Sequence, residues 1–76
     1  MTLADTKKNQ WVTVSAIGGE RGFRRRLLEM GFVAGTPVRI VRVAPLGDPL
    51  ELEVRGGRLS LRAAEAKSIT VAPGSP

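Results

Sequence analysis

Residues 50–62 constrain the fold more than any other part of the chain, because they have the pattern of a β-hairpin. Apolar and charged residues alternate along Leu-Glu-Leu-Glu-Val, which places Leu50, Leu52 and Val54 on one face of a strand. Gly56-Gly57 then predicts a two-residue turn into a second alternating run. This turn predicts three cross-strand pairs: Val54 with Leu59, Leu52 with Leu61, and Glu51 with Arg62.

A short helix is predicted between Glu20 and Met30. At about 100° per residue, Phe23, Leu27 and Met30 fall on one stripe, which we interpret as the buried face. Gly31 follows and is typical of the left-handed residue that ends a helix.

Leu28 lies outside this stripe, beside Arg24 one turn earlier. Two interpretations remain open at this point. Leu28 is either the flank of a wide buried face or a partly exposed apolar contact for a partner.

The order of the elements predicts the fold class. The remaining elements are a strand at 11–15, a strand at 38–43, one helical turn at 63–66 and a closing strand at 68–71. The apolar positions change parity between Ile40 and Val41, which predicts a bulge or a barrel corner. Short strands in so small a chain must curl to cover their edges, so we expect a mainly β fold. Its form is a small SH3-like barrel of about five strands, with one α-helix after the first strand and a short helical turn before the last.

Segment boundaries follow from composition. Residues 1–10 are polar and are expected to form a flexible segment, residues 11–72 the domain, and residues 73–76 a loose tail. Seven residues are interpreted as shaping turns: Gly31, Gly35, Pro45, Gly47, Pro49, Gly56 and Gly57. The first segment lacks the apolar middle of a signal peptide and no apolar run is long enough for a membrane helix, so we expect a cytoplasmic protein.

The composition excludes several chemistries. The chain has no cysteine and no histidine, so it lacks a thiolate or imidazole for nucleophilic catalysis and the preferred ligands of zinc and ferrous iron. The one cluster of acids comprises Asp48, Glu51, Glu53 and Glu65, and the two on the strand have arginine or serine neighbours. We therefore expect no catalytic residue, no cofactor and no dedicated metal site, with at most weak transition-metal binding through carboxylates.

The chain is strongly basic, with 12 Lys and Arg against 7 Asp and Glu and a net charge of +5. Such a balance suits nucleic acid, an anionic membrane surface or an acidic protein. The densest charge, Arg24-Arg25-Arg26, is either a solvated helix face, a protein-binding surface or a nucleic-acid contact. Because the aromatic residues are few and both Phe23 and Phe32 are expected inside, stacking on nucleic-acid bases is disfavoured.

A glycine-rich run, Gly18-Gly-Glu-Arg-Gly22, invites comparison with phosphate-binding loops. It lacks the Gly-Lys-Ser/Thr ending of a Walker loop, and a Glu inside the run would repel a phosphate backbone. We interpret it as a turn from strand to helix.

Three blocks together resemble one known family. They are Arg-Arg-Leu-Leu-Glu-Met-Gly-Phe-Val-Ala-Gly-Thr-Pro-Val (25–38), Ala-Pro-Leu-Gly-Asp-Pro-Leu-Glu (44–51) and Leu-Ser-Leu-Arg-Ala-Ala-Glu-Ala (59–66). The sequence resembles the FeoA family of small bacterial ferrous-iron transport proteins over nearly all of residues 11–71. It departs at Ala34, where the family often has proline.

The resemblance implies an SH3-like, cytoplasmic accessory protein without enzymatic activity or a small-molecule substrate. It would support the membrane ferrous-iron transporter through contact with its cytosolic, GTP-hydrolysing domain, at the inner face of the membrane.

The residues expected to contact a partner are chosen by their expected exposure. They are Arg24, Arg25, Leu28 and Glu29 on the helix, with Leu46 and Asp48 on the loop. Two alternatives remain: a small basic nucleic-acid-binding or regulatory barrel, and a groove for proline-rich peptides built around Trp11. A free edge strand would also allow weak homo-oligomers.

Overall fold

The computed structural model describes residues 1–74. Its elements are, in order, the 3-10 helix η1 (Leu3–Asp5), β1 (Val12–Ile17), α1 (Arg21–Glu29), β2 (Pro37–Val43), β3 (Leu50–Val54), β4 (Gly57–Leu61), α2 (Ala63–Ala66) and β5 (Ile69–Pro73). Apart from η1, this is the predicted order, and the mainly β class is confirmed.

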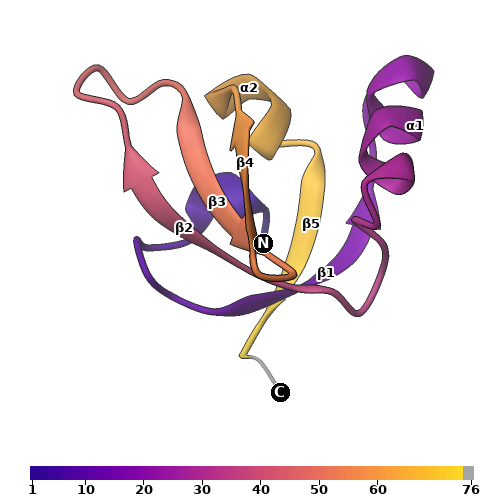
Figure 1. The fold of residues 1–76 in the computed structure, drawn as a ribbon, viewed down its shortest axis with the longest axis horizontal. Coiled ribbons are helices and arrows are strands. Elements are labelled where there is room, and N and C mark those ends of the chain that lie inside the picture. The colour runs from indigo at the N-terminus through magenta and orange to yellow at the C-terminus, as the bar shows by residue number, and fades with distance from the viewer. Residues whose placement is uncertain (75–76) are drawn as a thin grey trace.

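The five strands form one antiparallel sheet in the order β4-β3-β2-β1-β5. Figure 1 shows the sheet curled, with α1 at one upper corner, the β2–β3 loop at the opposite upper corner and α2 between them. The predicted irregularity in β2 is present, since the β2–β3 register shifts between Ile40 and Arg42. A second shift, in β1 between Val14 and Ala16, bends the strand paired with β5.

The curled sheet encloses a single apolar core. Its buried members come from every strand and helix, and they are Leu3, Val12, Val14, Leu27, Phe32, Val38, Ile40, Leu50, Leu52, Leu61, Ala66, Ile69 and Val71. α1 contributes one fully buried side chain, Leu27, and the half-buried Phe23 packs beside it. The rest of α1 is therefore free to face solvent.

The prediction of a flexible N-terminal segment outside the domain is wrong. Leu3 is fully buried in the core. Thr2 forms a bridge with Thr70, and the Val71 N–H donates a 2.9 Å hydrogen bond to the Met1 carbonyl. The segment lies along the free edge of β5, where it satisfies backbone groups that would otherwise face water unpaired.

The first turn of η1 is held by Asp5. The Thr2 backbone N–H donates to Asp5 Oδ2 at 2.9 Å and the Thr2 hydroxyl donates to the same oxygen at 3.2 Å. These bonds, the backbone one first, hold the pKa of the Asp5 carboxyl below its usual value. Since the carboxylate is the bonded form, its stabilising effect is present at neutral pH and is lost as the pH falls through the lowered pKa.

The expected C-terminal tail begins later than residue 73. β5 extends to Pro73, and the Thr13 hydroxyl donates a 3.0 Å hydrogen bond to the Gly74 carbonyl. Residues 75 and 76 lie outside the described part of the chain.

The hairpin is present, but its predicted register is wrong by two residues. The turn falls on Arg55-Gly56, both with positive φ (51° and 77°), so β4 begins at Gly57. Consequently Leu52 faces Leu59, and Glu51 faces Ser60 instead of Arg62. The Arg55 side chain explains this choice, because its Nε donates to the Gly31 carbonyl at 3.0 Å and fixes a conformation that non-glycine residues rarely adopt. A shift of two residues leaves the apolar face unchanged.

The predicted buried stripe of the helix is wrong at Met30, whose side chain is 47% exposed. The helix ends at Glu29 and Gly31 turns the chain with φ of 81°, so Met30 no longer continues the stripe. Phe32 fills the core position, and its N–H donates to the Leu27 carbonyl at 2.9 Å. No helix within residues 1–74 has the length and apolar character needed to cross a membrane.

Candidate protein-binding surface

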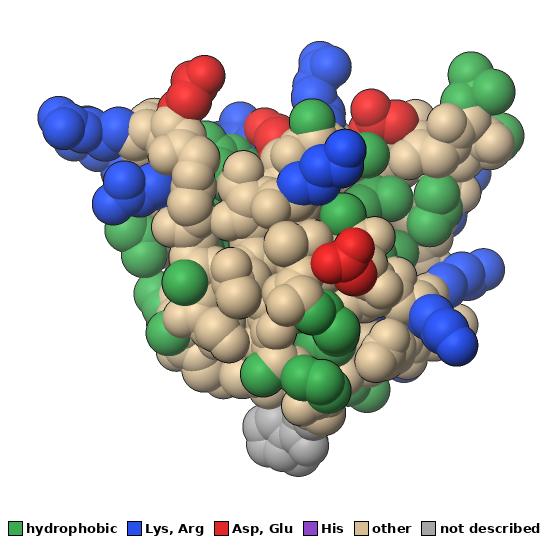
Figure 2. All heavy atoms as spheres, turned by 180° about the vertical axis from the view of Figure 1, so that it is seen from behind, with side chains coloured by type: hydrophobic (Ala, Val, Ile, Leu, Met, Phe, Trp, Pro, Cys, Tyr) green, Lys and Arg blue, Asp and Glu red, His purple; other side chains and the backbone are tan. Residues whose placement is uncertain are grey.

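The outer face of α1 combines charge with an exposed apolar side chain. Arg21, Arg24, Arg25 and Leu28 line a shallow hollow of about 200 Å³, and Leu28 is 54% exposed. We call these four residues the α1 surface. The structure thus brings together three of the predicted contact residues and settles the alternatives for Leu28 in favour of partial exposure. Figure 2 shows cationic side chains gathered at the corner formed by α1.

The α1 surface is oriented by contacts on the opposite side of the helix. Leu27 enters the core, while Arg26 forms a 3.2 Å ion pair with Glu65 of α2. The Arg26 guanidinium also lies 5.6 Å from the centre of the Phe23 ring. Of the four arginines on α1, Arg26 alone has a carboxylate partner among residues 1–74, so the other three are free to meet charges from outside.

Glu29 is exposed near the C-terminal end of α1. It stands four residues after Arg25, but among the described residues the two form no ion pair. Glu29 therefore adds a negative charge to the border of the α1 surface.

The two predicted loop residues lie apart from the α1 surface. Leu46 is 96% exposed at the β2–β3 loop, at the corner of the molecule opposite α1 (Figure 1). In the same loop the Asp48–Pro49 peptide bond is cis. Asp48 Oδ1 accepts a 3.0 Å hydrogen bond from the Ala63 N–H at the start of α2, which gives Asp48 a structural role as a cap.

Replacing Asp48 with alanine is expected to lower the free energy of unfolding by about 1 kcal/mol, because the Ala63 N–H loses its acceptor. Asp48→Asn keeps an acceptor oxygen and should lose less. Urea denaturation of the three proteins measures both effects. An alanine variant with unchanged stability but weakened partner binding would instead assign Asp48 to the interface.

The four acids of the predicted cluster, Asp48, Glu51, Glu53 and Glu65, are engaged individually. No group of three or more acids in residues 1–74 is arranged to hold an ion. Besides Asp48, each acid of that cluster has a cationic neighbour: Glu53 with Arg39 at 2.7 Å, Glu65 with Arg26 at 3.2 Å and Glu51 with Arg58 at 3.8 Å. These pairs compete with any weak metal binding by the same carboxylates.

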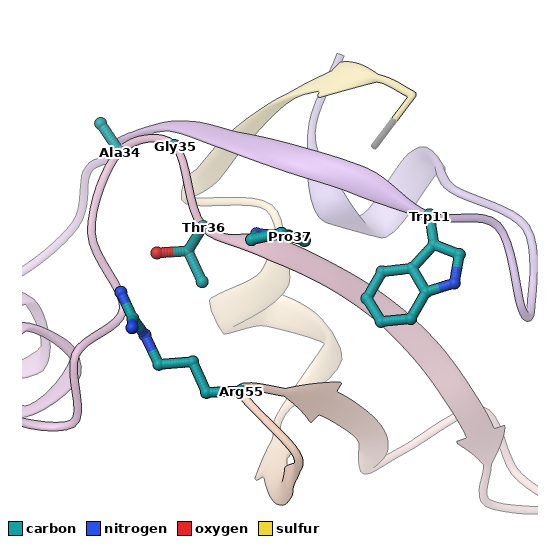
Figure 3. A pocket seen from close by; sticks show the side chains of 6 residues that line it. All are labelled: Trp11, Ala34, Gly35, Thr36, Pro37 and Arg55. Carbon is teal, nitrogen blue, oxygen red and sulfur yellow. The ribbon is translucent and has the colours of Figure 1, made fainter. Parts of the chain in front are cut away.

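A second hollow of about 370 Å³ lies near Trp11. Figure 3 shows Trp11 at one end, Arg55 at the other, and Pro37 between them. The Arg39 guanidinium lies 4.8 Å from the centre of the Trp11 ring and covers one of its faces. The lining of this hollow contains a single aromatic ring, that of Trp11. Grooves that bind proline-rich peptides offer several such rings, so the hollow gives little support to the proline-rich-peptide alternative.

A third hollow, also about 370 Å³, follows the outer edge of β4. We call it the β4 groove, and its lining is Arg26, Met30, Pro49, Leu59, Ser60, Leu61, Arg62 and Glu65. Sequence reasoning missed this groove because it placed Met30 in the core. A glycine directly after Met30 was the available signal that the helical stripe stops there.

The model of the FeoA domain matches residues 1–73 of the chain. The chain belongs to the FeoA family. The FeoA match includes the N-terminal residues, in agreement with the packing of Leu3.

Relatives support the same family and fold. A fusion of Fe(2+) transport protein A with the Fe(2+) transporter FeoB, from Porphyromonas gingivalis, is 35% identical over 71 residues, which are 93% of this chain and 8% of that protein. The chain therefore spans a small part of this relative.

Two solved FeoA structures resemble the fold closely. FeoA from Chlorobium tepidum is 38% identical, with a TM-score of 0.92 over 96% of this chain and 70% of its own. Zinc-complexed FeoA from Stenotrophomonas maltophilia, described as a prokaryotic SH3 domain protein, is 36% identical, with a TM-score of 0.82 over 93% of this chain and 88% of its own. The SH3-like class of the FeoA chain is thereby confirmed.

Proposed function

We propose that this FeoA-family chain is an accessory protein of bacterial ferrous iron uptake that acts by binding the cytosolic, GTP-hydrolysing part of a FeoB-type transporter. The Porphyromonas relative supports the pairing, because it carries both partners in one polypeptide. Protein contact, not catalysis, is the proposed mode of action. The protein would work in the cytoplasm, peripheral to the inner membrane through its partner.

The observation that carries this proposal is the α1 surface. An exposed Leu28 is surrounded by arginines that have no carboxylate partner among the described residues. Interfaces commonly combine an apolar centre with a polar rim, and arginine is enriched in them. Guanidinium groups also pair with carboxylates in a bidentate geometry. The α1 surface therefore suits an acidic patch with an apolar contact point on the partner.

Calorimetric titration of the protein into the purified cytosolic domain of the cognate transporter tests the proposal. We expect saturable one-to-one binding that weakens moderately with salt, because the apolar contact is not screened. Repeating the titration with a GTP analogue identifies the nucleotide state that is bound.

Random duplex DNA serves as the competing ligand. A protein that contacts six or more phosphates loses about 10³-fold in affinity between 50 and 200 mM salt. Absence of binding to the transporter domain in every nucleotide state, together with such salt-sensitive binding to DNA, would contradict the proposal and favour the nucleic-acid alternative.

A further inference from the structure

β4 ends the sheet and leaves part of its backbone unpaired. Its single neighbour is β3, and the turn makes Val54 and Gly57 the first pair of the ladder. Hydrogen-bonded pairs alternate with non-bonded pairs in an antiparallel hairpin, so Arg58 and Ser60 direct their N–H and C=O groups away from β3. Within residues 1–74 these groups have no other hydrogen-bond partner. β4 thus presents two donors and two acceptors along its outer edge.

The opposite edge of the sheet, formed by β5, is not open. β5 is covered by the chain's own N-terminus through the Thr2–Thr70 bridge and the bond from the Val71 N–H to the Met1 carbonyl. Exposed edges invite pairing with another chain, and proteins usually block them. Here one edge is blocked from within while the other stays open, beside a groove.

The β4 groove has apolar and cationic walls. Leu59 and the exposed Met30 supply apolar surface. In the lining, Arg62 has no ion pair among the described residues. Arg58, on β4 outside the lining, has a 59% exposed side chain and a long contact of 3.8 Å with Glu51. Glu65, the acid in the lining, is already paired with Arg26. The groove is therefore complementary to negative charge.

We propose that β4 binds an extended acidic segment of the partner polypeptide by strand addition. The N–H groups of Arg58 and Ser60 donate to carbonyls of the added strand, and their carbonyls accept its N–H groups. Because side chains alternate across a strand, apolar residues of the segment would meet Leu59 and acidic residues would meet Arg58. This inference rests on the proposed function and adds a second contact beside the α1 surface.

Ser60→Pro tests the proposal, since it removes the edge N–H without breaking a bond to β3. Against the transporter's cytosolic domain, we expect affinity to fall about tenfold or more. Ser60→Ala alters the same side chain but keeps the N–H, so the difference in affinity between the two variants measures the loss of the edge N–H. Circular dichroism and thermal unfolding establish that both variants fold.

Amide hydrogen exchange on the unaltered protein provides a second measurement that does not depend on the folding of a variant. The Arg58 and Ser60 amides should become protected in the complex. If the domain binds but these amides stay unprotected and Ser60→Pro binds equally well, strand addition is overturned and the proposed function stands. If the unaltered protein does not bind the domain, both strand addition and the proposed function are rejected. If protection of these amides grows with the concentration of this chain alone, the strand that pairs with β4 belongs to a second copy of the chain. That result would overturn the proposal of an acidic segment from the partner.

Discussion

Replacing Leu3 with alanine is expected to lower the free energy of unfolding by about 2–4 kcal/mol. Leu3 is fully buried although it lies in a polar stretch, and its removal leaves a cavity lined by core residues that cannot close completely. A domain of this size has a total stability of roughly 4–11 kcal/mol, so the substitution removes a large part of it. The midpoint of urea denaturation, with an unchanged slope, measures the loss.

Leu46→Ala is the matched control, because it deletes the same atoms from a side chain that is 96% exposed. We expect its free energy of unfolding to stay within about 0.5 kcal/mol of that of the unaltered protein. Equal midpoints for Leu3→Ala and Leu46→Ala would show that residues 1–10 contribute nothing to the core. The original expectation of a flexible segment would then be restored.

Local signals in the sequence predicted most of the secondary structure. Alternation from Leu50 to Val54, the helical period before Gly31 and the parity change after Ile40 each depend on neighbours in the chain. Such patterns are encoded within a few residues, and the structure reproduces them. They predicted the order of elements and the apolar face of each strand.

The predictions were wrong where contacts between residues far apart in the sequence determine burial or strand register. One leucine among polar residues has no period, so the burial of Leu3 follows from the open edge of β5 and not from its own segment. The hairpin register depends on Arg55, which accepts a left-handed conformation while bonded to the Gly31 carbonyl, 24 residues earlier. Neither contact is visible in a local pattern.

The α1 surface and the β4 groove also differ in how far a local sequence pattern could predict them. The α1 surface lies on one helix, so the helical period could group its residues outside the buried stripe, although it left the exposure of Leu28 open. The β4 groove combines α1, β4, α2 and the β2–β3 loop, and only folding brings these elements together. Asp48 illustrates the limit of exposure arguments, because a charged loop residue proved to cap a helix.

Disrupting the α1 surface is expected to weaken binding to the transporter domain strongly. Leu28→Ala should raise the Kd about tenfold, as is typical when an apolar contact at the centre of an interface is truncated. Arg25→Glu should raise the Kd about tenfold at low salt and less at high salt, since it replaces attraction to an acidic patch by screened repulsion. Calorimetry at two salt concentrations separates the two effects.

The double variant should raise the Kd about 30-fold, short of the roughly 100-fold of simple additivity, because both residues line the same hollow. Arg42→Glu, an exposed arginine on β2, and Val43→Ala, a 42% exposed valine on the same strand, make comparable changes away from α1 and should bind normally. Equal losses in the control pair would mean that net charge alone drives association, because a basic chain is attracted to an acidic partner from any side. A loss confined to the α1 pair requires that partner to touch this face of the helix.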